Sequence, residues 1–346
     1  MFPALSLSLP LARCFLLPSS GPQYRPGGGI ELSGFPSFAP QTRPVASDRT
    51  EDLKVLNFAL SLENLVSAFL SVGLGRFSED DFLNAGYPRS ARDLYAGILV
   101  NERAHIHSLL SIVQPSEVRV IGTCDYGFPI DTVEDFVDLS EAIAALAVST
   151  YTGMISTLTT KAYVSLLSGI LAVEGRHSAW ISSSLRSGSP WNGPFETPTT
   201  FNHTWSIARV YVSSCPPGND PEAVLPPNLL NFPILEITSH VEAGQRISIH
   251  FTDDLYVQGL PLFAAFLIGN RNALVPVEVD SNGDRWLNIP QDLTAMGAVW
   301  ILIVQDFTQG GLLPVTDANT VAGPALVYFP TNSADNRSVR QNAWSW

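Results

Sequence analysis

The chain has 346 residues, of which 45% are hydrophobic and 15% are charged, and its formal net charge is −13 at pH 7. This length is enough for two domains with a sizeable core, and the composition excludes a chain that is disordered throughout. The acidic balance disfavours nucleic acid and anionic membranes as partners and favours cations, although a solubilising surface charge explains the same excess. We therefore expect no nucleic-acid partner.

The N-terminal part of the chain contains a candidate leader. Residues 1–22 have an apolar core, but Arg13 interrupts it and no charged segment precedes it, so it is an imperfect signal peptide. A mis-assigned start and an unusual leader are the two explanations of this irregularity. Residues 23–50 are rich in proline, glycine and serine and have no hydrophobic period, which predicts an extended linker.

Four long stretches with helical spacing of apolar residues follow the linker. They cover residues 51–74, 90–113, 132–158 and 159–185. Between the first two, Ser78 and Asp81 have the spacing of a capping box for a short helix, and Asp131 and Thr132 can cap the third long helix. Four long helices joined by modest loops predict a four-helix bundle over residues 51–186.

Parts of the third and fourth predicted helices are long enough and apolar enough to raise the question of a membrane hairpin. Residues 142–160 and 162–173 contain no charged residue. The first of these stretches is rich in serine and threonine, and the second is short and runs directly into Glu174, Arg176 and His177. We therefore expect no membrane span.

The hydrophobic period changes after the bundle. Residues 187–232 are rich in proline and irregular, and a period of two begins at Pro233. The β-rich runs are ILEIT, RISIHF, LFAAFL, VPVEV, VWILIV and ALVYF. They predict an antiparallel β-sandwich over residues 233–330, followed by a polar, flexible tail at 331–346. The expected fold class is therefore multidomain α+β, and the sequence does not indicate a partner for the β-domain.

Two Glu-x-x-His pairs lie on the predicted helices: Glu102 with His105, and Glu174 with His177. The 14 glutamates and 6 histidines of the chain would give about 0.24 such pairs by chance. Residues three, four and seven positions away share a helix face, and for both pairs that face is mostly apolar. The same test predicts that Glu63 of the first helix also points inward. The pattern thus predicts three buried carboxylates and two buried imidazoles.

Carboxylates in a core favour a bound cation. Burying an unpaired carboxylate costs several kcal/mol, and converging carboxylates also repel one another. A glutamate from one helix and Glu-x-x-His pairs from two others are ligands of carboxylate-bridged di-iron and di-manganese sites. Each pair taken alone is also explained by a hydrogen bond on a helix surface.

The third helix departs from this ligand pattern. Its central stretch, AIAALAVSTY, has no carboxylate, and Glu141 is the nearest glutamate. Tyr151 lies on the same helical stripe and is a candidate hydrogen-bond donor to a ligand.

The cysteines and two sequons bear on the cellular compartment. Cys14 falls in the leader, which leaves Cys124 and Cys215, and the sequons predict glycosylation at Asn202 and Asn336. An even number of cysteines fits a secreted glycoprotein with one disulfide. Two free buried thiols in a cytosolic protein are the alternative.

Several short motifs resemble those of the fungal secreted ferritin-like proteins, which are often labelled stress-response or late-sexual-development proteins and are similar to plant desiccation-related proteins. In order they are LNFALSLENL, RFSEDDFLNAG, NERAHIHSLL, CDYGFPID, STYTG, VEGRHSAWI, PFETPTTFN and SSCPPGN. They extend over roughly residues 51–220. The resemblance implies a ferritin-like four-helix bundle, secretion and a di-metal site. The ligand types predict iron or manganese in that site, and the expected location is the medium or the cell wall.

The resemblance also implies the ligand positions. They are Glu63, Glu102, His105, Glu174 and His177. The glutamate that the family has on the third helix would fall at Ala144, where this sequence departs from the pattern. Either Glu141 reaches the site from one turn away, or the site holds one metal ion, or it is a relic. A disulfide between Cys124 and Cys215 would attach the proline-rich segment to the end of the bundle.

Two functions follow from these observations. In the first, a ferritin-like protein uses its metal for oxidase-type chemistry with oxygen or peroxide. In the second, a non-enzymatic secreted or wall-associated protein uses the bundle as a scaffold with a degenerate site, and its β-domain binds a partner. The two Glu-x-x-His pairs favour metal binding, and the missing third-helix glutamate favours the scaffold.

Overall fold

The protein is described from a computed structural model, and the chain divides into two compact units, Met1–Ser37 and Phe38–Trp346. The residues that the structure describes all belong to the second unit. They are 46–217, 225, 229–237, 241–291, 297–308 and 313–329. The predicted leader, most of the predicted linker and the predicted tail lie outside the described residues.

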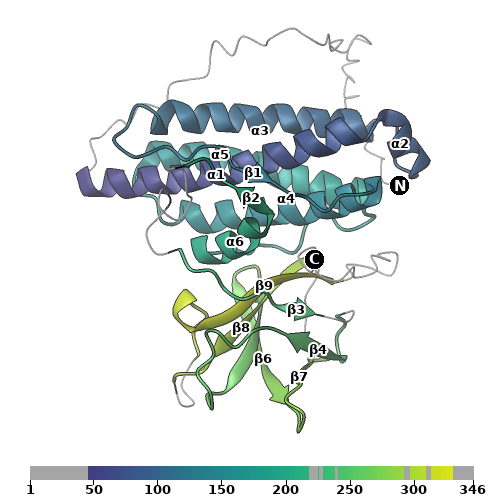
Figure 1. The fold of residues 1–346 in the computed structure, drawn as a ribbon, viewed down its shortest axis with the longest axis vertical. Helices are drawn as coiled ribbons and strands as arrows, with labels where there is room; N and C mark the ends of the chain where they lie inside the picture. The colour runs from purple at the N-terminus through teal and green to yellow at the C-terminus, as the bar shows by residue number, and fades with distance from the viewer. Residues whose placement is uncertain are drawn as a thin grey trace, which may run out of the picture. The chain divides into compact units, whose positions relative to one another are not determined.

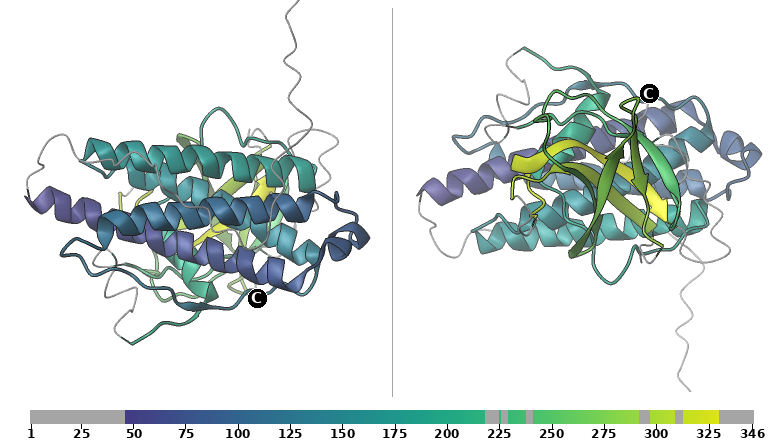
Figure 2. Two further views of the ribbon diagram at one scale, coloured as in Figure 1. Left: turned by 90° about the horizontal axis from the view of Figure 1, so that it is seen from above. Right: turned by 90° about the horizontal axis from the view of Figure 1, so that it is seen from below.

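Four long helices form a bundle, as the apolar spacing predicts (Figure 1). They are α1 (Ala46–Arg76), α3 (Ala91–Val113), α4 (Val133–Ile155) and α5 (Lys161–Trp180). The helix α1 packs along α3, and α4 packs along α5. The view from above in Figure 2 shows the long helices lying alongside one another. Each helix turns its apolar stripe toward the shared core, which is the arrangement that stabilises such bundles.

The helix ends follow local signals in the sequence, with one exception. The short helix α2 (Glu79–Asn84) begins at a capping box formed by Ser78 and Asp81, and α4 begins at a second one formed by Thr132 and Asp135. The exception is the end of α1, because this helix includes Gly73 and continues past the predicted end at residue 74 to Arg76. A Cβ atom at Gly73 would lie 2.1 Å from Cε2 of Phe136, so this glycine allows α1 and α4 to approach closely.

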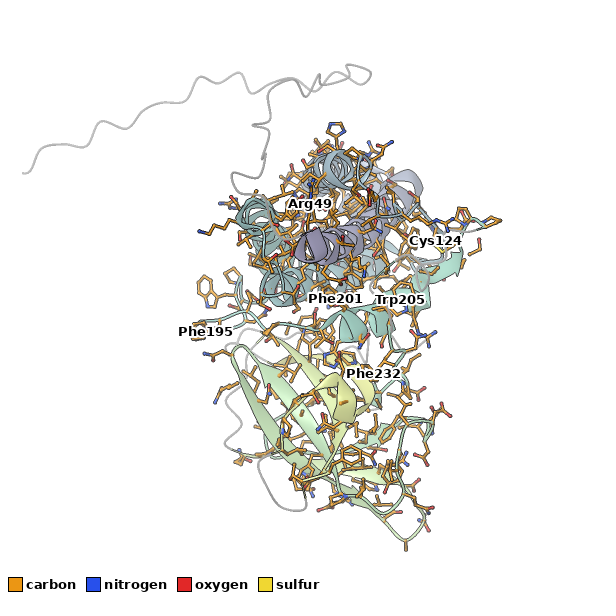
Figure 3. The ribbon with its side chains drawn as sticks, turned by 90° about the vertical axis from the view of Figure 1, so that its left-hand side faces the viewer. Arg49, Cys124, Phe195, Phe201, Trp205 and Phe232 are labelled. Atoms are coloured by element: carbon orange, nitrogen blue, oxygen red, sulfur yellow. A yellow bond between two sulfur atoms is a disulfide. The ribbon has the colours of Figure 1, made fainter. Side chains whose placement is uncertain are left out.

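The proline-rich connection contains a helix that the sequence reading does not predict. This helix, α6 (Phe201–Ala208), is capped by Thr200, whose hydroxyl accepts a hydrogen bond from the backbone nitrogen of His203. Figure 3 shows Phe201 and Trp205 along this helix. The ring of Phe201 packs edge-on against Phe58 of α1, with centroids 4.9 Å apart. The connection is therefore partly anchored to the bundle rather than irregular throughout.

A disulfide links the segment that follows α6 to the loop between α3 and α4. Cys124 and Cys215 are bonded, which confirms the predicted pair. They flank two short antiparallel strands, β1 (Asp125–Tyr126) and β2 (Val212–Ser214), and a 3₁₀ turn at Arg209–Tyr211 precedes β2. Figure 3 labels Cys124 at this edge of the bundle.

The C-terminal part is an antiparallel β-structure, as predicted. Its strands are β3 (Glu236–Ile237), β4 (Arg246–His250), β5 (Leu262–Ile268), β6 (Arg271–Val279), β7 (Arg285–Asn288), β8 (Gly297–Gln305) and β9 (Thr320–Phe329). They pair in the order β3-β4-β7-β6-β5-β8-β9, and a 3₁₀ turn at Asp317–Asn319 precedes the last strand. The sequence reading did not predict β7, which is only four residues long. The sheet curls so that strands from both of its ends share one apolar core, which gives it a sandwich-like character.

The strand β8 is buried on both faces. Val299 and Ile301 belong to the core inside the β-structure, whereas Trp300 and Leu302 belong to the same apolar cluster as the bundle helices. The indole nitrogen of Trp300 donates a hydrogen bond of 2.8 Å to the hydroxyl oxygen of Ser149 on α4. The fold class is thus a mixed α+β chain, with a helical bundle followed by an antiparallel β-structure.

The described residues include one helix, from Arg49 to Arg76, that is long and apolar enough to cross a membrane by length and composition. Its most apolar window is 72% buried inside the protein. A core helix of a bundle has the same length and composition, so this is weak evidence for a span.

Candidate metal centre

Three helices of the bundle bring polar side chains to one place in the core. The helix α1 contributes Glu63, α3 contributes Glu102 and His105, and α5 contributes Glu174 and His177. The relative exposures of the three glutamates are 1%, 0% and 2% in that order. Each carboxylate is directed inward because its neighbours on the helix face are apolar, as the spacing predicts.

His105 lies among all three carboxylates. Its Nδ1 atom is 3.4 Å from an oxygen of Glu63, 3.4 Å from an oxygen of Glu102 and 3.3 Å from an oxygen of Glu174. One ligand atom from each of these four residues lies within 4.8 Å of the other three. Contacts of this kind join three separate helices around one small volume.

His177 completes the group from the other side. Its Nδ1 atom is 3.1 Å from Oε1 of Glu102 and 3.5 Å from Oε2 of Glu174. The opposite ring nitrogen, Nε2, lies 3.0 Å from the side-chain nitrogen of Asn101. This contact holds the ring with Nδ1 toward the carboxylates. We call Glu63, Glu102, His105, Glu174 and His177 the five-residue cluster.

The helix α4 contributes a phenol to the cluster. Tyr151 is fully buried, and its hydroxyl donates a hydrogen bond to Oε1 of Glu63. Tyr151 therefore contacts a candidate ligand in the way that its position on the helical stripe predicts. Ala144, two turns earlier on the same helix, is buried and carries no ligand atom.

Glu141 is directed to a different partner. One of its carboxylate oxygens lies 3.4 Å from Nε of Arg186, and the neighbouring Asp138 lies 2.5 Å from Nη1 of the same guanidinium. Arg186 follows a π-helical extension of α5 at Ile181–Leu185. The structure therefore brings Glu141 to an ion pair at the end of α5, and does not include it among the residues that share the ligand volume.

The electrostatics of the cluster reflect burial and crowding. Burial raises the pKa of Glu63 well above its usual range, and the nearby charge of Glu102 raises it further. Burial also acts to raise the pKa of Glu102, but its contacts with the two imidazoles outweigh burial and lower that pKa to about 2. Burial acts to lower the pKa of each histidine, whereas the carboxylates raise it to about 12 for His105 and to about 9 for His177. Without a metal, these shifts favour a proton on Glu63 and on each imidazole, and such protons reduce the negative charge of the cluster.

Proximity does not give every cluster atom a well-aligned hydrogen bond. Both oxygens of Glu102, Oε1 of Glu174 and Nδ1 of His177 are buried and have no aligned partner within the described part of the chain. Leaving such atoms unpaired costs roughly 1–3 kcal/mol each, and more for charged groups. Carboxylate oxygens and imidazole nitrogens are also a donor set suited to iron and manganese. The residues present therefore fit a metal ion.

The two predicted glycosylation sites differ in what the structure describes. Asn202 lies on α6, where its amide nitrogen donates to Asp317 and its amide oxygen accepts from the backbone nitrogen of Leu230. A glycan would be attached through the same amide nitrogen that donates to Asp317. Asn336 lies outside the described residues. Glycosylation of both sites stays a prediction.

Comparison with known families and proteins agrees with the geometry of the bundle. Residues 51–187 match the ferritin-like domain family. The bundle is a ferritin-like domain. This match confirms the family that the sequence motifs predict, and its limits agree closely with the predicted bundle at 51–186.

A relative from Schizosaccharomyces pombe, named Protein rds1, extends beyond the ferritin-like domain in its similarity. It is 25% identical to this chain over 251 residues, an alignment that covers 72% of this chain and 58% of the relative. The chain therefore spans less than two thirds of the length of that protein. The similarity supports a fungal ferritin-like family.

Sequence reasoning missed two residues that shape the ferritin-like domain. Asn101 holds the ring of His177. The sequence signal for Asn101 is its position next to Glu102. Arg186 pairs with Glu141 and Asp138. No sequence spacing reveals that pairing, because the partners are 45 residues or more apart.

Proposed function

We propose that the ferritin-like domain binds iron or manganese through Glu63, Glu102, His105, Glu174 and His177. One observation carries the proposal: four ligand atoms from three helices, all in residues that are buried or nearly so, lie within 4.8 Å of one another. The unaligned oxygens of Glu102 and Glu174 support it, because a cation would satisfy them.

Each residue has a role that follows from its chemistry. The three glutamates supply oxygen ligands and balance the charge of the ion, and the two histidines supply one nitrogen ligand each. Tyr151 orients Glu63 through its hydrogen bond, and Asn101 orients His177. A bound iron or manganese ion would supply one-electron redox chemistry with oxygen or peroxide, which is the oxidase-type function.

A non-enzymatic scaffold is the second candidate function. It is supported by the departure on α4, where position 144 is alanine and Glu141 is engaged by Arg186. In this alternative the site is a relic, and the β-structure binds a partner outside the cell or in the cell wall. Metal content separates the two candidates.

We also propose that the protein is secreted or wall-associated and acts in fungal stress responses or sexual development, as the resemblance implies. The disulfide supports an oxidising compartment, because such bonds are rare in the cytosol. Expression of the full chain in a fungal host, followed by assay of the medium, wall and cell fractions, tests the location. Recovery only from the cytosol, with Cys124 and Cys215 reduced, would contradict it.

The metal-binding proposal is tested by the metal content of the purified full chain. The chain is expressed with added iron or manganese, exchanged into metal-free buffer and analysed by elemental mass spectrometry. The wild type is expected to retain one of these metals at close to a whole-number ratio. Glu102→Gln and His105→Ala are expected to weaken retention at least about tenfold, because each removes a ligand.

Two exposed residues of the same region give matched controls. Glu117→Gln and His107→Ala make the same chemical changes at exposed positions outside the five-residue cluster. They are expected to retain metal as the wild type does, and thermal unfolding curves check that all variants fold. A folded wild-type protein without iron or manganese after metal-supplemented expression would favour the scaffold.

A further inference from the structure

The ligand contribution of α4 differs from that of the other three long helices. The structure describes α4 in full, and its two acidic residues nearest to the cluster, Asp138 and Glu141, face the guanidinium of Arg186. The side chain by which α4 contacts the cluster is the phenol of Tyr151. A two-metal site in a four-helix bundle uses a carboxylate from each helix, so one of the four expected carboxylates is replaced here by a hydrogen-bond donor.

Tyr151 also changes how Glu63 can bind an ion. Its hydroxyl occupies Oε1 of Glu63, whereas Oε2 lies 3.4 Å from Nδ1 of His105 and faces the cluster. With Oε1 hydrogen-bonded to Tyr151, Oε2 is the oxygen of Glu63 that faces the cluster. This arrangement favours Glu63 as a terminal ligand through Oε2 over a bridge that uses one oxygen for each of two ions.

The size of the ligand volume agrees with one ion. Ligands on opposite sides of a single ion lie about 4 Å apart, since each is about 2.0–2.2 Å from it. Two ions in a shared site lie about 3.5–4 Å apart, which separates their outermost ligands by roughly 7–8 Å. One ligand atom from each of Glu63, Glu102, His105 and Glu174 lies within 4.8 Å of the other three. His177 adds a fifth ligand, 3.1 Å from Glu102.

We propose that the five-residue cluster binds one metal ion per chain rather than two, and that Ala144 and Tyr151 on α4 set this number. The inference rests on the proposed function, since it concerns the same ligands. Alanine at position 144 then removes the binding of a second ion and leaves the binding of the first.

The test is a titration of the metal-free full chain with Mn²⁺ under anaerobic conditions. Equilibrium dialysis gives the number of ions bound per chain, and electron paramagnetic resonance distinguishes an isolated Mn²⁺ ion from a magnetically coupled pair. We expect one ion per chain and the spectrum of an isolated ion. Two ions with a coupled spectrum would overturn the inference and leave the proposed function intact, whereas no binding would overturn both.

Substitutions on α4 test the assigned cause. Ala144→Glu together with Tyr151→Phe supplies a fourth carboxylate and frees the second oxygen of Glu63, so it is expected to raise the ratio to two ions. Ala144→Gln with Tyr151→Phe is the matched control, because it has the same size without the charge, and it is expected to stay at one. If the first variant folds and still binds one ion, α4 does not set the number.

Discussion

At the scale of single residues, the cluster is a problem of buried charge. Three carboxylates within one volume repel one another, and burial adds the cost of desolvating each of them. In the metal-free protein, protons on the two histidines offset the negative charge of the carboxylates. The carboxylates raise the pKa of His105 to about 12 and that of His177 to about 9, although burial acts to lower both values. A metal ion would take the place of these protons.

This exchange predicts that metal binding releases protons. Both histidines must lose a proton to bind a metal, and the raised pKa of Glu63 favours a proton there too. Because protons compete with the ion, affinity is expected to rise with pH across the neutral range, and about two or more protons should be released per ion. Calorimetric titration at pH 7 in buffers of different ionisation enthalpy measures this number.

His107→Ala serves as the control for the calorimetry, since this exposed histidine is two residues from His105 and should leave proton release unchanged. Binding heats that are the same in every buffer would mean that no protons leave. That result would contradict the protonated state of the metal-free cluster.

Much of the cluster could be predicted from the sequence, because helical spacing alone decides which side chains share an inward face. Glu102 and His105 on α3 are three residues apart with apolar neighbours, and the structure brings them together. The partner of Glu141 could not be predicted in this way. Its guanidinium follows a π-helical turn at Ile181–Leu185, and sequence spacing does not specify how such a turn directs a distant side chain.

At the scale of secondary-structure elements, helix starts offer a matched comparison. The hydroxyl of Thr132 caps α4 by accepting from the backbone nitrogen of Asp135, whereas Ser90 before α3 makes no side-chain cap bond. Thr132→Ala is expected to lower the free energy of unfolding by about 1 kcal/mol, because a backbone donor loses its partner. Ser90→Ala should change it by less than about 0.5 kcal/mol.

Denaturant unfolding of the two variants and the wild type measures this difference. Equal stabilities of the Thr132 and Ser90 variants would show that the cap of α4 contributes nothing to the fold. Metal-free protein is used throughout, because a bound ion would stabilise the native state of every variant and obscure a difference of this size.

The elements that sequence reasoning missed are short. The helix α6 is eight residues long and lies in a proline-rich stretch, so its apolar spacing extends over only two turns, although Thr200 supplies a cap. The strand β7 has four residues and pairs with β4 and β6. Both elements are fixed by their contacts within the fold rather than by their own sequence pattern, since Phe201 packs on Phe58 and β7 fills a place between two strands.

At the scale of the whole molecule, the β-structure and the bundle share apolar contacts through β8. The run VWILIV is continuously apolar, which is typical of a strand buried on both faces rather than one. Its alternate side chains enter two cores, and Trp300 bonds to Ser149 of α4. The sequence contains this signal, but the surface that covers the second face could not be predicted from it.

The disulfide acts at the same scale. Cys124 and Cys215 are separated by 91 residues, and the closed loop includes α4, α5 and α6. The helix α5 contributes both Glu174 and His177. A bridge of this span restricts the unfolded chain and stabilises the fold by about 2–4 kcal/mol. It therefore helps to hold together a core that buried polar groups would otherwise destabilise.

Anomalous X-ray diffraction shows directly whether a metal ion lies inside the ferritin-like domain. Crystals of the full chain are grown with Mn²⁺ or Fe²⁺, and data are collected on both sides of the absorption edge of that metal. We expect an anomalous peak surrounded by Glu63, Glu102, His105, Glu174 and His177. Clear density for these five side chains without a peak between them, or with metal bound only elsewhere, would contradict it.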